Sequence, residues 1–221
     1  YLHEKGGFDA IFSVLKNADS MPDEFSRNQR NWFEMNGWMA LSDQSISPKG
    51  APIIADYAGR CKGIEFMVER LQAHHRPHEL VFDLEHAVRL RQLTIRYEIT
   101  CNIQGILSND KEDQEWAEAA VKAGLLQELL YTMTEERDFS CSPLWASCSA
   151  LDSLLSRNTP RSESYKAQLI DLGAVEITRQ ALRSCTPFHP FGNMQFMAGM
   201  TWGQVHPADQ TCAHALQLLT S

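Results

Sequence analysis

The sequence lacks the long apolar runs that would place it in a membrane. No stretch approaches the roughly 18 consecutive apolar residues that suggest a membrane span. The N-terminal residues, Tyr1-Leu2-His3-Glu4, contain no basic stretch followed by an apolar one, so no signal peptide is visible. Membrane insertion is therefore not expected.

The signature motifs of common cofactor and enzyme classes are also missing. Neither G-x-G-x-x-G nor G-x-x-x-x-G-K-[ST] occurs, which argues against a phosphate-binding loop. Asp110, Glu112 and Asp113 lie close together, but they precede a helical pattern, where carboxylates serve as a helix cap and as partners of the helix dipole. We predict no cofactor, no catalytic residue and no enzyme activity. An enzyme of an unrecognised helical class is the competing interpretation.

Basic residues are too few and too scattered for a nucleic-acid-binding protein. Lys and Arg total 20 against 28 Asp and Glu, which gives a formal net charge of -8. Proteins that bind nucleic acid usually carry a basic stripe that neutralises phosphates. The acidic balance instead favours a protein or peptide partner with basic character.

Cysteine pairs at metal or redox spacing are absent as well. The chain has six cysteines, and no two are spaced as C-x-x-C. Cys101, Cys148 and Cys212 fall inside helical patterns beside small residues, where a free thiol behaves as a small apolar side chain. This pattern predicts reduced thiols and a cytoplasmic location, with a nuclear one as the alternative.

A cluster of histidines near Pro77 raises the question of a metal site. His74, His75 and His78 could bind a metal ion with help from a nearby carboxylate. Metal ligands must converge and usually need supporting hydrogen bonds, whereas clustered surface histidines in a loop are common. We therefore predict no metal site.

What the chain does contain is helical periodicity. Between Trp116 and Met133 the apolar residues follow one helical face, with an interruption at Gly124. Residues 95–107 and 144–155 show the same spacing, and clear period-2 strand patterns are absent. The sequence predicts an all-α fold.

A short phrase recurs four times: a small or polar residue, then glycine, then a short apolar helix. The key glycines are Gly7, Gly63, Gly124 and Gly173, with a period of 49 to 61 residues. We expect each glycine to adopt a left-handed cap, which lets the next helix start at a sharp angle. A longer helix is expected after three of the phrases, and a weaker counterpart for the first unit, over residues 97–108, 145–156, 210–221 and 25–41.

These units resemble the armadillo family of helical repeats. Residues 111–130 are similar to that family's first and second helices, and residues 148–156 are similar to the core of a third helix. HEAT repeats share these motifs. The resemblance implies a right-handed superhelical α-solenoid of about four irregular repeats. It implies one domain over 1–221, which we expect to be a fragment of a larger protein. The units depart from that family in being longer than its repeats, and we expect the excess residues in long loops at 42–52, 74–77, 157–164 and 186–207.

The third helices of such a solenoid would line its concave face. Opposite the leucine-rich side of 145–156, one stripe contains Trp145, Ser149 and Asp152. Equivalent stripes lie on the other third helices. The Trp and Asn ladder of importin-like proteins is not present. The predicted partner-binding residues are Tyr97, Gln104, Trp145, Ser149, Asp152, His214 and Gln217.

The predicted function is a protein–protein interaction scaffold that binds a peptide or protein on this concave face, through aromatic anchors and polar side chains. Ordinary solvated helix faces are the competing interpretation of the stripes. The alternative function is a regulatory or structural spacer within a large multidomain protein, such as a ligase or a cytoskeletal or trafficking regulator. Uncapped repeat ends would also favour self-association.

The apolar segment 186–207 either folds back on the solenoid or forms a methionine-rich contact.

Overall fold

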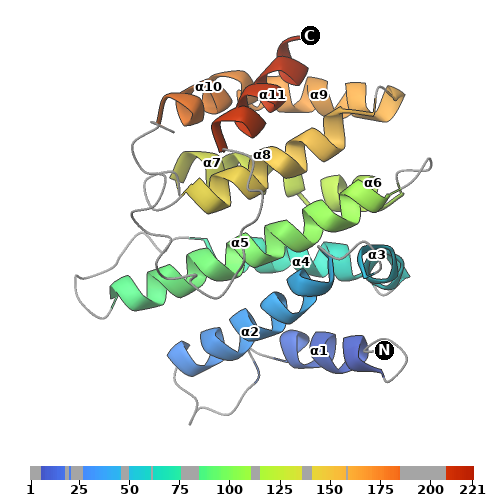
Figure 1. The fold of residues 1–221 in the computed structure, drawn as a ribbon, viewed down its shortest axis with the longest axis vertical. Coiled ribbons are helices and arrows are strands. Elements are labelled where there is room, and N and C mark those ends of the chain that lie inside the picture. The colour runs from blue at the N-terminus through green and yellow to red at the C-terminus, as the bar shows by residue number, and fades with distance from the viewer. Residues whose placement is uncertain are drawn as a thin grey trace. The chain divides into compact units, whose positions relative to one another are not determined.

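The structure is a computed structural model, and within the residues that it describes the chain is entirely helical (Figure 1). The described residues are 6–17, 20, 27–45, 50–60, 62–75, 85–110, 115–135, 141–157, 159–184 and 208–221. They form 11 helices and no strand, so the predicted all-α class is confirmed. The helices are α1 (Gly7–Lys16), α2 (Arg27–Ser45), α3 (Ala51–Arg60), α4 (Gly63–Ala73), α5 (Glu85–Asn109), α6 (Glu115–Lys122), α7 (Leu125–Glu135), α8 (Cys141–Leu155), α9 (Pro160–Asp171), α10 (Ala174–Ser184) and α11 (Ala208–Thr220).

The chain divides into two compact units, which we call the N-terminal unit (Tyr1–Leu125) and the C-terminal unit (Leu126–Ser221). The N-terminal unit contains α1 to α6. The C-terminal unit contains α8 to α11 and nearly all of α7. The prediction of one domain over 1–221 stays a prediction.

A left-handed residue stands directly before each of the four short helices that the glycine phrases predicted. These residues are Gly6 before α1, Lys62 before α4, Gly124 before α7 and Gly173 before α10, with φ of 70°, 56°, 105° and 81°. Each of these helices is 10 or 11 residues long. A left-handed residue turns the chain sharply, so each short helix starts in a new direction.

Two of the four glycines play a different role from the one predicted. Gly7 and Gly63 are the first residues of their helices, and the positive φ falls on the residue before. At Gly63 the constraint is space, because an added Cβ would lie 3.1 Å from the Cα of Ala58 and 3.1 Å from the ring of Phe12. Gly63 therefore allows the start of α4 to approach α3 and α1 closely.

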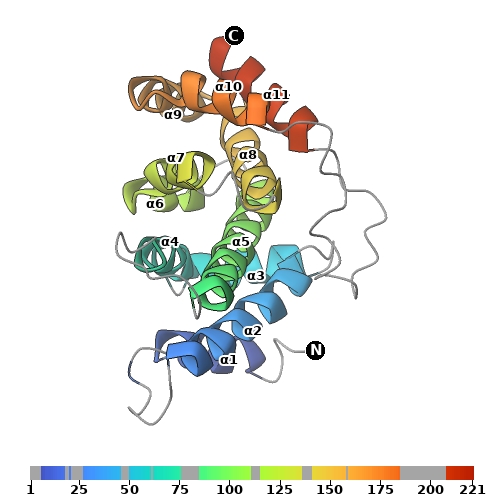
Figure 2. The same cartoon turned by 90° about the vertical axis from the view of Figure 1, so that its left-hand side faces the viewer.

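The core of the N-terminal unit surrounds α5, which packs against α2, α3 and α4 (Figure 2). Residues 95–103 of this helix are all buried, with polar side chains among them. Beside it, α2 contributes Trp38, whose side chain is fully buried. The ring of Phe12 from α1 meets Trp38 edge-on at 6.3 Å between centroids. Phe12 also contacts Tyr57 and Phe66, which joins α1 to α3 and α4.

In the C-terminal unit α8 packs against α9 and α11, and α10 packs against α9 and α11. The start of α9 corrects one expected loop, 157–164, because the helix already begins at Pro160. The hydroxyl of Thr159 accepts a hydrogen bond from the backbone N–H of Ser162, and the Ser162 hydroxyl accepts one from the N–H of Thr159. This reciprocal cap, with proline at the first helical position, stabilises an early helix start.

Two further expected loops differ from the structure or fall outside it. Helix α2 continues to Ser45 and α3 begins at Ala51, so the loop predicted at 42–52 is wrong at both of its ends. The segment 186–207 lies outside the described residues, and its two interpretations stay predictions.

Candidate partner-binding surface

The predicted stripes on α8 and α11 meet in the C-terminal unit. Helices α8 and α11 pack against each other (Figures 1 and 2), and Nδ1 of His214 lies 2.8 Å from Oδ1 of Asp152. The two side chains are 53% and 35% exposed, so each is partly accessible from solvent. Tertiary packing therefore brings together side chains that are 62 residues apart in the sequence, which is the difference between positions 214 and 152.

The contact between Asp152 and His214 is electrostatic. The Oδ1 atom of Asp152 is itself shielded from solvent and accepts no hydrogen bond of good geometry, although the His214 nitrogen is close to it. The two groups form an ion pair when the imidazole is protonated. Partly exposed pairs of this kind contribute about 0 to 1 kcal/mol to stability. The pair is therefore better suited to present polar groups at a surface than to hold the fold together.

The other stripe residues of the C-terminal unit differ in exposure. On α8, Trp145 and Ser149 are half-buried, and the carbonyl oxygen of Ser149 accepts a hydrogen bond from the Ser153 hydroxyl. On α11, Gln217 is exposed. We call Trp145, Ser149, Asp152, His214 and Gln217 the α8–α11 surface.

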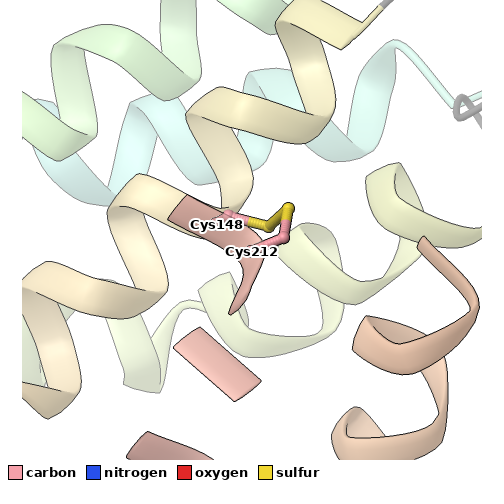
Figure 3. Close-up of a disulfide and its surroundings, with 2 residues drawn as sticks. All are labelled: Cys148 and Cys212. Atoms are coloured by element: carbon pink, nitrogen blue, oxygen red, sulfur yellow. A yellow bond between two sulfur atoms is a disulfide. The ribbon is translucent and has the colours of Figure 1, made fainter. Parts of the chain in front are cut away.

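A disulfide lies beside this surface and corrects the prediction of reduced thiols. Cys148 of α8 and Cys212 of α11 are bonded, with their Cα atoms 5.2 Å apart (Figure 3). Both side chains are completely buried. Their 64-residue separation hid the pairing, because only the packing of α8 on α11 brings them together. Cys101, by contrast, is a free buried thiol, as predicted. The cytoplasmic location was inferred from reduced thiols, so it stays a prediction that this pair does not support.

The two contacts also indicate how α11 is aligned on α8. Along α8, Cys148 precedes Asp152, and along α11 their partners Cys212 and His214 follow in the same order. The two helices therefore run in the same general sense where they touch.

The predicted site residues of the N-terminal unit occupy more enclosed positions. Tyr97 is buried, with 8% of its surface exposed. Burial raises the pKa of its hydroxyl, and the neighbouring Cys101 raises it further. Gln104 is half-buried, and its side-chain amide donates a hydrogen bond to the Ser108 hydroxyl at 3.0 Å. As partner-binding residues, both remain predictions.

A buried charged cluster in the N-terminal unit was not foreseen from the sequence. The guanidinium of Arg70 on α4 donates two hydrogen bonds to the carboxylate of Glu34 on α2, at 2.8 and 2.7 Å. Nε2 of His74 lies 2.9 Å from the same carboxylate, and Trp38 Nε1 donates to it at 3.2 Å. Burial alone raises the pKa of Glu34, but hydrogen bonds and charges from His74 and Arg70 outweigh burial and lower this pKa to about 2. His74, one of the three histidines considered for a metal site, therefore belongs to a buried network with Glu34 and Arg70.

A second unforeseen group is the carboxyl of Glu98 on α5. Burial and, to a smaller degree, the charge of Asp43 raise its pKa, a hydrogen bond with Ser42 opposes the rise, and the resulting pKa is about 7. One of its oxygens, Oε1, is buried without a hydrogen-bond partner. One turn along the helix, Asn102 donates hydrogen bonds to the carbonyl oxygens of Trp38 and Glu98, which ties α5 to α2. These groups belong to the packing of α5 against α2 within the N-terminal unit.

Comparison with known proteins assigns no family. Searches against protein-family models, curated proteins and solved structures found no match to this chain. The armadillo resemblance therefore rests on the residues of this chain and stays a prediction. None of the helices in the described ranges is long and apolar enough to cross a membrane. Within the same ranges, no three His, Cys, Asp or Glu side chains are grouped so that they could hold a metal ion; His78 lies outside them.

Proposed function

We propose that this chain is a protein-interaction scaffold of the armadillo type, and that a peptide or protein segment docks on the α8–α11 surface. The observation that carries the proposal is the 2.8 Å contact between Asp152 and His214. It joins two stripes that helical phasing assigned separately on two predicted third helices. A surface assembled from adjacent helices is what a groove-lining ladder requires.

The order of helices supports the armadillo part of the proposal. Reading from α3, two helices of 8 to 12 residues are followed by a longer one, which groups α3–α5, α6–α8 and α9–α11. In each group the second helix follows a left-handed residue. Helices α1 and α2 match the last two members of such a triplet. Third helices that stack in a solenoid run in the same sense, as α8 and α11 do where they touch.

The chemistry of the surface favours a partner segment with Lys or Arg. The chain carries a net charge of -8, and Asp152 is its partly exposed carboxylate within the surface. Trp145 of the same surface is half-buried, and the faces of tryptophan rings attract guanidinium and ammonium groups. Binding anchors in protein interfaces are commonly such partly enclosed aromatic residues. The proposed partner therefore uses a basic side chain against Asp152 and a second contact on Trp145.

A peptide-display library selected on the full chain tests this proposal. We expect the selected peptides to be enriched in Lys and Arg. Their affinity, measured by calorimetry, should fall about tenfold for Asp152→Asn, as expected when a charge-assisted pair is lost. Trp145→Ala should weaken binding to a similar degree. Asp171→Asn is the matched control, because it removes an exposed carboxylate at the end of α9, a helix that contributes no residue to the α8–α11 surface. Selected peptides that bind all variants with wild-type affinity would refute the proposal.

A further inference from the structure

We propose that the Cys148–Cys212 disulfide is a redox lock, which holds α11 on α8 when oxidised and releases α11 when a thiol reductant opens it. Because α11 carries His214 and Gln217, the lock would also control the α8–α11 surface. That last step rests on the proposed function, whereas the lock itself does not.

The position of the disulfide is the first argument. Cys148 lies one helical turn before Asp152 on α8, and Cys212 lies two residues before His214 on α11. The bond, drawn in Figure 3, thus lies close along both helices to the contact between Asp152 and His214. Any separation of the two helices at the disulfide would also separate Asp152 from His214.

The weak anchoring of α11 is the second argument. Among the side chains described between 144 and 155 on α8, eight are buried, whereas between 212 and 221 only three are buried: Cys212, Ala215 and Leu219. Ala215 has a small side chain, so Leu219 is the one large buried apolar group of this part of α11. Once the bond to Cys148 is broken, the helix is held on α8 and α10 by Leu219 and by the partial burial of Leu216 and Leu218. Between 212 and 221 these contacts bury less side-chain surface than α8 buries between 144 and 155, so α11 is the helix expected to open first.

The chemistry of release is thiol–disulfide exchange. A thiolate of the reductant attacks one sulfur and forms a mixed disulfide, while the other cysteine leaves as a thiolate and takes up a proton. A second thiol of the reductant then displaces the remaining cysteine. Two electrons pass to the chain, which gains the thiols of Cys148 and Cys212, while the reductant becomes a disulfide. Since both cysteines are completely buried, attack requires α11 to lift, so reduction should be slow in the native chain and faster in mild urea.

Hydrogen exchange on the full chain, equilibrated in oxidised or reduced glutathione, tests the lock. Alkylation and peptide mapping first establish whether Cys148 and Cys212 are linked. We expect the backbone amides of residues 213–220 to exchange about tenfold faster in the reduced chain, because α11 opens locally. The double variant Cys148→Ala/Cys212→Ala should show the fast exchange in both buffers. Cys101→Ala is the matched control, because it removes the free buried thiol of the N-terminal unit and should keep the full redox response.

The outcomes separate the lock from the proposed function. Exchange of α11 that is the same in both buffers, or the absence of a linked peptide from the oxidised chain, would overturn the lock. The reduced wild-type chain provides this comparison even if the double variant does not fold. A redox-dependent α11 in a chain that selects no stripe-dependent peptide would support the lock and refute the docking proposal.

Discussion

Replacing Glu98 with glutamine should remove a loss of stability that the wild-type chain undergoes as the pH rises. The carboxyl of Glu98 is almost completely buried on α5, and its pKa is raised from 4.5 to about 7. In the unfolded chain the group ionises near its usual pKa, so between these two values the unfolded state gives up a proton that the folded state retains. The free energy of unfolding therefore falls as the pH rises through this window and levels off above it.

The expected size follows from this difference in pKa. A pKa difference of about 2.5 corresponds to about 3.4 kcal/mol over the full window, and about 2.5 kcal/mol of it falls between pH 5 and pH 8. Glutamine has nearly the same shape as a protonated glutamate and is neutral at every pH. Glu98→Gln should therefore match the wild type closely at pH 5 and exceed it by about 2.5 kcal/mol at pH 8.

Urea denaturation of both proteins at pH 5 and pH 8 measures this quantity. The other titrating groups are common to both chains, so they cancel when the two pH differences are subtracted. Glu69→Gln on α4 is the matched control, because this carboxylate is exposed, and it should keep the pH difference of the wild type. If Glu98→Gln loses stability between pH 5 and pH 8 as steeply as the wild type, the buried carboxyl is not the source of the effect and the reasoning is refuted.

Two further substitutions test the packing of the N-terminal unit. Glu34→Gln should destabilise the chain by about 3 kcal/mol at pH 7, because it removes the charge that Arg70 and His74 surround. In the wild type this contribution to the free energy of unfolding is present above pH 4.5 and is lost as the pH falls towards about 2, the lowered pKa of Glu34. The acid denaturation curves of the two proteins should therefore converge at low pH. Curves that stay parallel would contradict this expectation. Gly63→Ala should cost about 1 to 3 kcal/mol in urea denaturation, because the new Cβ crowds its neighbours. Gly6→Ala meets no atom within 4 Å and should cost about 1 kcal/mol through its positive φ alone, so equal losses would argue against steric crowding at Gly63.

Local features of this chain could be read from its sequence because they depend on near neighbours. Helical spacing of apolar residues placed α7, residues 95–107 of α5 and residues 144–155 of α8, and the glycine phrases marked where α1, α4, α7 and α10 begin. The ten residues of α5 before Ile95 were not predicted. The early start of α9 had a readable signal that was missed, since Thr159 and Pro160 followed by Ser162 form a helix N-terminus. Capping and turns involve residues a few positions apart, so their physics is contained in short stretches of sequence.

The buried polar groups could not be predicted in this way. Arg96, Glu98 and Asn102 look like the solvated side of a helix, yet α5 is enclosed by its neighbours and buries them. Periodicity identifies one apolar face, but it does not reveal whether a second element covers the polar one. The same limit applies to Tyr97, which was expected on an open face and is buried.

By itself, the sequence determined the helical class, the approximate starts of four short helices and the acidic balance, since these follow from neighbouring residues and from composition. Only the tertiary structure decided which distant side chains meet: Glu34 with Arg70, Cys148 with Cys212, and Asp152 with His214. Each pair joins two helices that are separated by tens of residues. Their meeting depends on how whole helix faces pack, and many packings are compatible with the same local pattern.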